Sequence, residues 1–185
     1  MTTTEMVVLA LIVIATVVAI AFYLRTRTQH LRDRFGPEYE RAVEQSGGQR
    51  QGEAQLQARE KRVREYGLKP LSQAERDRFD AEWRRVQAMF VDSPKDATVQ
   101  ADMLLGKVMT ARGYPENADF DQRLEDLSVD HAQSVQNYRA AQDVAQRHAR
   151  GDASTEDMRQ AMIHYRALFD ELVGEAETPT LKAAS

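Results

Sequence analysis

The sequence of 185 residues contains no cysteine, which excludes structural disulfides, thiol catalysis and metal sites with cysteine ligands. Glycine and proline are also scarce, with 9 and 5 residues, and most of them stand where a helix would end or begin. The formal net charge is -4, and no clustered basic face of the kind that binds nucleic acid is present. Alanine, glutamate and arginine, which favour helices, are abundant, so we expect an all-α fold.

Residues 6–24 form a long apolar run without any charged side chain. A helix of this length, at ~1.5 Å per residue, spans about the ~30 Å of a bilayer core. A core helix of a soluble protein is the alternative, but such a helix rarely lacks charge for so long. We therefore predict a transmembrane helix over 6–24, in contact with the lipid bilayer, after a short extracytoplasmic tail over 1–5.

A secretory signal is the main rival of the anchor, since Ala19-Ile20-Ala21 has the form of a cleavage motif. Residues 1–5 carry no basic side chain, whereas the start of a signal peptide is positively charged. An exported domain behind an uncleaved or cleaved signal stays the alternative.

Four basic residues follow the apolar run closely: Arg25, Arg27, Arg32 and Arg34. Because basic residues stay on the cytoplasmic side, they predict an N-terminus outside the cell membrane and a cytoplasmic domain. The same arginines would also attract an anionic lipid surface, which is a third functional alternative. Ala15 and Ala19 form a small-xxx-small pair, so a homo-oligomer is an alternative to a protein partner of another kind.

Residues 25–70 have the composition of a polar helical stalk. Gly36-Pro37 marks a break, and a polar helix is expected from about Gln51 to Tyr66. Leu56 and Val63 are among the few sizeable apolar residues of that helix, so little burial is expected there.

Residues 71–174 carry clear amphipathic patterns and predict a compact antiparallel helical bundle. Ser72, Ser93, Asp130 and Ser154 are the expected N-terminal caps, and Gly113 the expected end of a helix. Trp83, Met158 and Met162 fall on apolar stripes and are expected in the core. No strand alternation is present, and residues 175–185 are predicted to be a disordered tail.

The sequence lacks the motifs of common catalytic, phosphate-binding and metal sites, so we expect no enzyme activity, no cofactor and no metal. The alternative is a ligand-binding or enzymatic site formed by His131 and His164 if their helices pack side by side. Tyr114, Asp130, His131 and His164 are the candidate surface residues. Tyr114 either belongs to a recognition loop or folds back over a helix end.

Four stretches resemble a known family: residues 90–94 (FVDSP), 112–115 (RGYP), 126–131 (DLSVDH) and 161–166 (AMIHYR). The chain is similar to a family of uncharacterised bacterial single-pass membrane-anchored helical proteins. This resemblance implies a bacterial origin and a location in the plasma membrane, and it carries no catalytic or binding residue over. Together with the anchor, it predicts a non-enzymatic interaction or scaffolding module at the inner face of the membrane.

Overall fold

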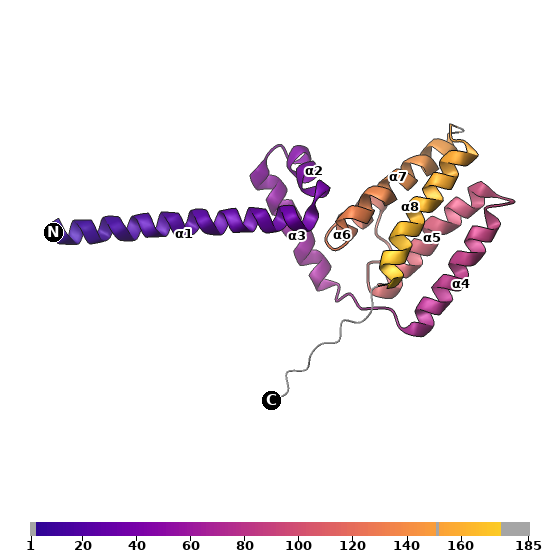
Figure 1. The fold of residues 1–185 in the computed structure, drawn as a ribbon, viewed down its shortest axis with the longest axis horizontal. Helices are drawn as coiled ribbons and strands as arrows, with labels where there is room; N and C mark the ends of the chain where they lie inside the picture. The colour runs from indigo at the N-terminus through magenta and orange to yellow at the C-terminus, as the bar shows by residue number, and fades with distance from the viewer. Residues whose placement is uncertain (1–2, 151, 175–185) are drawn as a thin grey trace, which may run out of the picture. The chain divides into compact units, whose positions relative to one another are not determined.

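The computed structural model describes residues 3–150 and 152–174 (Figure 1). These residues form eight α-helices and no β-strand, which confirms the all-α prediction for this part of the chain. The helices are α1 (Thr3–Phe35), α2 (Pro37–Gln45), α3 (Gln49–Glu65), α4 (Gln73–Met89), α5 (Pro94–Arg112), α6 (Phe120–Leu127), α7 (Ala132–Ala149) and α8 (Thr155–Gly174). The chain divides into two compact units, Met1–Leu56 and Gln57–Ser185. The predicted disordered tail, 175–185, lies outside the described residues.

Helix α1 is a single helix of 33 residues, about 50 Å long at ~1.5 Å per residue. Its part Leu11–Phe35 is long and apolar enough to cross a membrane, and an N-terminal signal sequence would meet the same two criteria. The large apolar side chains from Leu11 to Leu24 are more than half exposed. The Thr16 hydroxyl donates to the Ile12 carbonyl at 2.8 Å, so it is satisfied without water.

The N-terminal unit has a small apolar core just beyond this exposed stretch. Five side chains are at most 1% exposed: Leu31, Phe35, Tyr39, Ala42 and Leu56. Helix α1 ends at Phe35, Gly36 has a positive φ of 47°, and Pro37 begins α2, as the sequence predicts. The segment expected to be a polar stalk thus buries more apolar surface than its composition indicates.

Glu53 joins the three helices of this unit through one carboxylate oxygen. That oxygen accepts hydrogen bonds from Thr28 of α1 at 2.8 Å, Tyr39 of α2 at 2.9 Å and Gln49 of α3 at 2.8 Å. Burial raises the pKa of Glu53, but the hydrogen bonds outweigh burial and leave the pKa below its ordinary value. The ionised Glu53 therefore stabilises this unit, and the stabilisation is lost as the pH falls through the lowered pKa.

Gly52 allows α3 to approach α2 closely. A Cβ atom at this position would lie 2.8 Å from the Val43 Cα and 2.9 Å from the Val43 nitrogen. Both are backbone atoms, so no side-chain rotation can relieve the overlap. A glycine in the interior of a helix costs about 0.5–1 kcal/mol relative to alanine, and here the close approach explains its presence.

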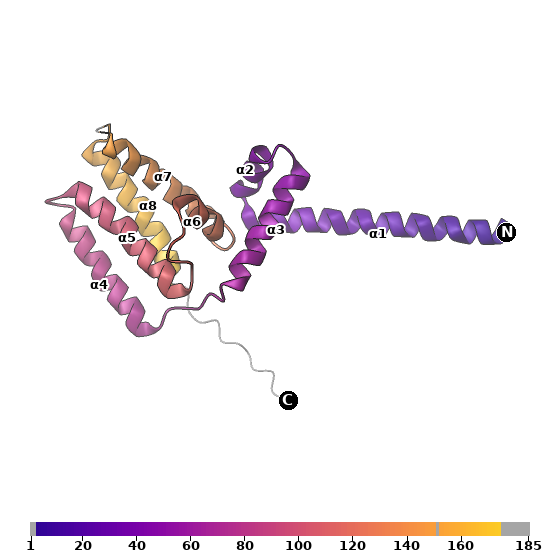
Figure 2. The ribbon, with the colours of Figure 1, turned by 180° about the vertical axis from the view of Figure 1, so that it is seen from behind.

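The C-terminal unit is built on the packing of α4 against α5, α5 against α8, and α8 against α7. Two opposite views show α5 and α8 between α4 and α7 (Figure 1, Figure 2). Helix α8 buries eight side chains, more than α4 or α6, and the core that it shares includes Trp83, Met158 and Met162, as predicted. Trp83 of α4 stacks on Phe169 of α8 with ring centroids 4.8 Å apart. Offset aromatic stacking adds about 0.5–1.5 kcal/mol beyond the burial of the two rings.

Several predicted helix ends are confirmed. Ser72 and Glu75 form a reciprocal capping box at the start of α4. The Ser154 hydroxyl accepts from the Asp157 backbone nitrogen at 3.1 Å, so Ser154 caps α8. Gly113 ends α5 in the left-handed conformation, with φ 107°.

The cap at Ser93 is confirmed in position only. Ser93 is the N-cap residue of α5 and Pro94 takes the first helical position, but the Ser93 side chain makes no capping hydrogen bond. Helix α7 begins at Ala132, so its N-cap position falls on His131, one residue after the predicted Asp130. The carbonyl of His131 accepts the first bond of α7, from Val135 at 3.0 Å.

Two glycine-to-alanine substitutions in helix interiors should have opposite effects. We expect Gly52→Ala to destabilise α2 and α3 by about 1–3 kcal/mol, because the methyl group overlaps the backbone of Val43. Gly106→Ala should stabilise α5 by about 0.5–1 kcal/mol, since the nearest atom there, on Arg123, would lie 3.7 Å from the new Cβ.

Hydrogen exchange of the amides of α2 and α5 in the full-length protein measures the two effects separately. Faster exchange in α2 for Gly52→Ala and slower exchange in α5 for Gly106→Ala is the expected pattern. The same direction of change for both variants would contradict the role given to Gly52.

Candidate functional site

His131 stands immediately before α7 and is 4% exposed. Its Nδ1 lies 3.1 Å from Oε2 of Glu171 on α8. The hydroxyl of Ser134 donates a hydrogen bond to the other oxygen of the same carboxylate. Glu171 thereby joins the start of α7 to the end of α8, which shows that these two neighbouring helices run in opposite directions.

A depression of about 510 Å³ opens beside this group and is lined by Asp130, His131, Ala132, Gln133, Asp170, Glu171 and Gly174. A serine nucleophile needs a base that takes its proton and an acid that orients the base. Here the carboxylate lies between the hydroxyl and the imidazole, so the order of groups is not that of a catalytic triad. The arrangement fits a structural tie between two helices better than a reaction centre.

The predicted pair of histidines is not brought together at this site. His131 contacts Glu171, whereas His164 lies seven residues earlier on α8, which is about 10 Å along the helix axis. Within the described residues, no three His, Asp or Glu side chains are placed to hold a metal ion. The meeting of His131 and His164 in one site, on which the ligand-binding or enzymatic alternative was based, is therefore not seen beside Glu171.

Two of the four candidate surface residues, Tyr114 and His131, are buried, at 3% and 4% exposed. For Tyr114 the structure fits the alternative in which the ring folds back over a helix end, and not the recognition loop. After the left-handed turn at Gly113, the Tyr114 ring folds back and packs edge-on against Tyr66, with centroids 6.3 Å apart. Asp130 is exposed and His164 is partly exposed, as expected of surface residues.

An apolar groove lies between α4 and α8 on the surface of the C-terminal unit. Its volume is about 300 Å³, and it is lined by Trp83, Gln87, Phe90, Arg159, Met162, Ile163 and Arg166. Ile163 is 48% exposed, although its neighbours Met162 and Tyr165 are buried. A half-exposed isoleucine on a groove lined by aromatic and methionine side chains is typical of a surface that binds a partner.

Two arginines border this groove on α8. Arg159 uses Nε and Nη2 to bind both oxygens of Glu156, at 2.8 and 2.7 Å. Arg166 uses the same two atoms on Asp170, at 2.8 and 2.7 Å. Arg166 also lies over the rings of Trp83 and Phe169, at 5.5 and 5.4 Å. These pairs leave the Nη1 donors of both guanidinium groups for other acceptors.

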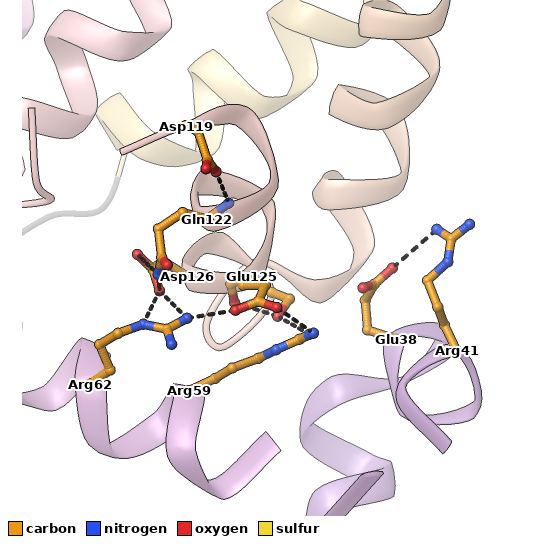
Figure 3. A network of polar contacts seen from close by, with 9 residues as sticks. Glu38, Arg41, Arg59, Arg62, Asp119, Gln122, Glu125 and Asp126 are labelled. Atoms are coloured by element: carbon orange, nitrogen blue, oxygen red, sulfur yellow. Dashed lines mark hydrogen bonds and ion pairs between the residues drawn. The ribbon is translucent and has the colours of Figure 1, made fainter. Parts of the chain in front are cut away.

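A polar cluster joins the second half of α3 to α6, and we call it the arginine clasp: Arg59, Arg62, Tyr66, Gln122, Glu125, Asp126 and Ser128. Figure 3 shows the two arginines pointing from α3 toward the two acids of α6. Arg62 binds Asp126 through Nε at 2.8 Å and Glu125 through Nη2 at 2.8 Å. Arg59 reaches Glu125 at 3.2 Å. The Tyr66 hydroxyl donates to Asp126 at 2.9 Å.

The clasp is a partly buried structural contact rather than a ligand site, since its charges already satisfy one another, although the Glu125 and Arg62 side chains stay 40% and 33% exposed. Asp126 is 1% and Arg59 7% exposed. Burial lowers the pKa of Arg62, but the hydrogen bonds that it donates to Glu125 and Asp126 outweigh burial, and the pKa is raised above its ordinary value. The sequence does place Arg59, Arg62 and Tyr66 on one face, at helical spacings of three and four, but nothing in that spacing indicates that α6 is their partner.

Asp126→Ala should destabilise the C-terminal unit by about 1–3 kcal/mol, because Arg62, Tyr66 and Gln122 lose a buried acceptor together. Asp143→Ala is the matched control: Asp143 is an exposed acid paired with Arg147 in one helix, and its removal should cost less than about 0.5 kcal/mol. Denaturant titration of the full-length protein, followed by circular dichroism, compares the two. Equal losses would show that the clasp adds nothing beyond a surface ion pair.

Comparison with known proteins adds no assignment to these sites. No protein-family model matches the chain, and no curated protein and no solved structure is significantly similar to it. The resemblance to bacterial membrane-anchored proteins therefore stays a prediction. The groove between α4 and α8 is the surface whose chemistry best fits a function.

Proposed function

We propose that the chain is a non-enzymatic docking module, an antiparallel helical bundle that α1 anchors to the cytoplasmic face of a membrane. The observation that carries this proposal is the groove between α4 and α8. Ile163 is 48% exposed and Phe90 is partly exposed, so both offer apolar surface that a partner would bury, and the buried Trp83 and Met162 also line the groove. At ~25 cal/mol per Å², covering even one such side chain contributes about 1–2 kcal/mol to binding.

The anchor supports the same function. A tether confines the groove to a thin layer beside the membrane, which raises its effective concentration toward other membrane proteins. Modest affinity is then sufficient for occupancy of the groove.

The cytoplasmic orientation rests on the arginines that follow the apolar stretch. Arg25, Arg32 and Arg34 are exposed and Arg27 is partly exposed, so all four charges lie close to the end of the apolar run. The residues before the run include only one charge, Glu5. This asymmetry favours retention of the arginine-bearing side in the cytoplasm.

Cysteine labelling tests the orientation, since the chain has no cysteine of its own. Val91→Cys places a thiol at a position that is 83% exposed. We expect a membrane-impermeant maleimide to label it only after the cells are opened. A cysteine in a tag ahead of Met1 is the control and should react in intact cells. The reverse pattern would place the helical domain outside.

Photo-crosslinking in cells tests the docking role. A photoreactive residue at Ile163 should give a discrete adduct with one protein, and the same residue at Met103 should not. Met103 is the matched control, because it is an exposed apolar residue of α5, 53% exposed against 48% for Ile163, outside the groove. No adduct at Ile163, or equal adducts at both positions, would contradict docking at this groove.

A further inference from the structure

The groove between α4 and α8 carries a charge pattern as well as an apolar surface. Arg159, Ile163 and Arg166 lie on one face of α8, at spacings of four and three residues. The arginines stand on either side of Ile163, about 10 Å apart along the helix axis. An occupant that covers Ile163 thus meets a guanidinium group at each end, each already paired with an acid of α8.

Each arginine can donate hydrogen bonds to a second carboxylate while it stays paired with Glu156 or Asp170. Their side chains are 51% and 39% exposed, so the guanidinium groups are within reach of a partner. Glu156 and Asp170 occupy the Nε and Nη2 atoms, and the Nη1 end of each group stays available. The cation–π contacts of Arg166 with Trp83 and Phe169 hold its guanidinium at the groove.

The shape of the surface favours a helix as the occupant. The described residues include no strand edge that an extended peptide would join. A surface between two helices is the usual receptor for an amphipathic helix, whose anchors recur at i, i+3 or i+4, and i+7. Those spacings match the spacings of Arg159, Ile163 and Arg166 on α8.

We propose that this groove binds an amphipathic α-helix of a partner protein, in which two acidic residues seven positions apart flank an apolar residue. The two acids bind Arg159 and Arg166, and the apolar residue packs beside Ile163 over Trp83 and Phe90. This inference rests on the proposed docking function and specifies the partner. The seven-residue spacing follows from geometry, because both helices rise by the same ~1.5 Å per residue.

A designed peptide tests the proposal with the full-length protein in nanodiscs of zwitterionic lipid. The probe is a fluorescein-labelled, alanine-based helix of 15 residues, with glutamates seven positions apart and leucines between them. Fluorescence anisotropy measures its dissociation constant, and empty nanodiscs correct for adsorption to lipid. Replacing both glutamates by glutamine should weaken binding about fivefold to tenfold.

Variants of the protein test whether the preference for the glutamate peptide depends on the two arginines. Arg159→Gln should remove about half of the preference for the glutamate peptide over the glutamine peptide. The double variant Arg159→Glu with Arg166→Glu should instead prefer a third peptide, in which lysines replace both glutamates. Arg147→Gln is the control, because Arg147 also pairs with acids, Asp143 of its own helix and Asp157 of α8, but lies outside the groove. Among the described residues, the polar partner of Arg159 is Glu156 of its own helix, and half of its side chain is exposed, so its substitution should leave the core packing unchanged.

Three results would overturn the inference: equal affinity for the glutamate and glutamine peptides, equal loss in Arg147→Gln, or displacement of the peptide by vesicles of anionic lipid. The last result would assign the groove to a membrane surface. An adduct at Ile163 in cells together with any of these results would leave the docking function standing and reject only the acidic helix.

Discussion

The packing of α8 is the constraint on which the C-terminal unit depends. This helix lies against α5 and α7 and reaches α4 through the stack of Phe169 on Trp83. A helix with neighbours on several sides has a wide apolar face, and α8 buries Met158, Met162, Tyr165, Phe169 and Leu172 along it. The groove is the part of that wide face that α4 leaves uncovered. The apolar side chains of α8 therefore form both the core of the unit and part of the candidate binding surface.

The polar contacts of the unit follow from the same arrangement. Helices α7 and α8 pack side by side in opposite directions, so the start of α7 lies beside the end of α8. A polar side chain there, Glu171, reaches the polar groups at the start of α7. In the clasp, α3 presents too little apolar surface to bind α6 by burial alone. Paired charges supply the specificity instead, and their cost in desolvation is offset by the number of hydrogen bonds each group makes.

Local signals in the sequence were sufficient for most helix boundaries, because capping and helix termination depend on neighbouring residues. Ser72, Gly113 and Ser154 behave as their local patterns indicate. Residues whose role depends on distant partners were not predictable in this way. Tyr114 is buried because Tyr66, far away in sequence, lies beside it. The arginine clasp joins residues more than sixty positions apart, and a polar helix gives no sign of what its charges face.

The unbroken course of α1 from its apolar stretch to Phe35 has a mechanical consequence. Because the helix continues without a break from Leu24 to Phe35, any tilt of its apolar stretch is carried unchanged to its end. In a bilayer, the tilt of this one helix would therefore set how far Arg32 and Arg34 stand from the lipid surface.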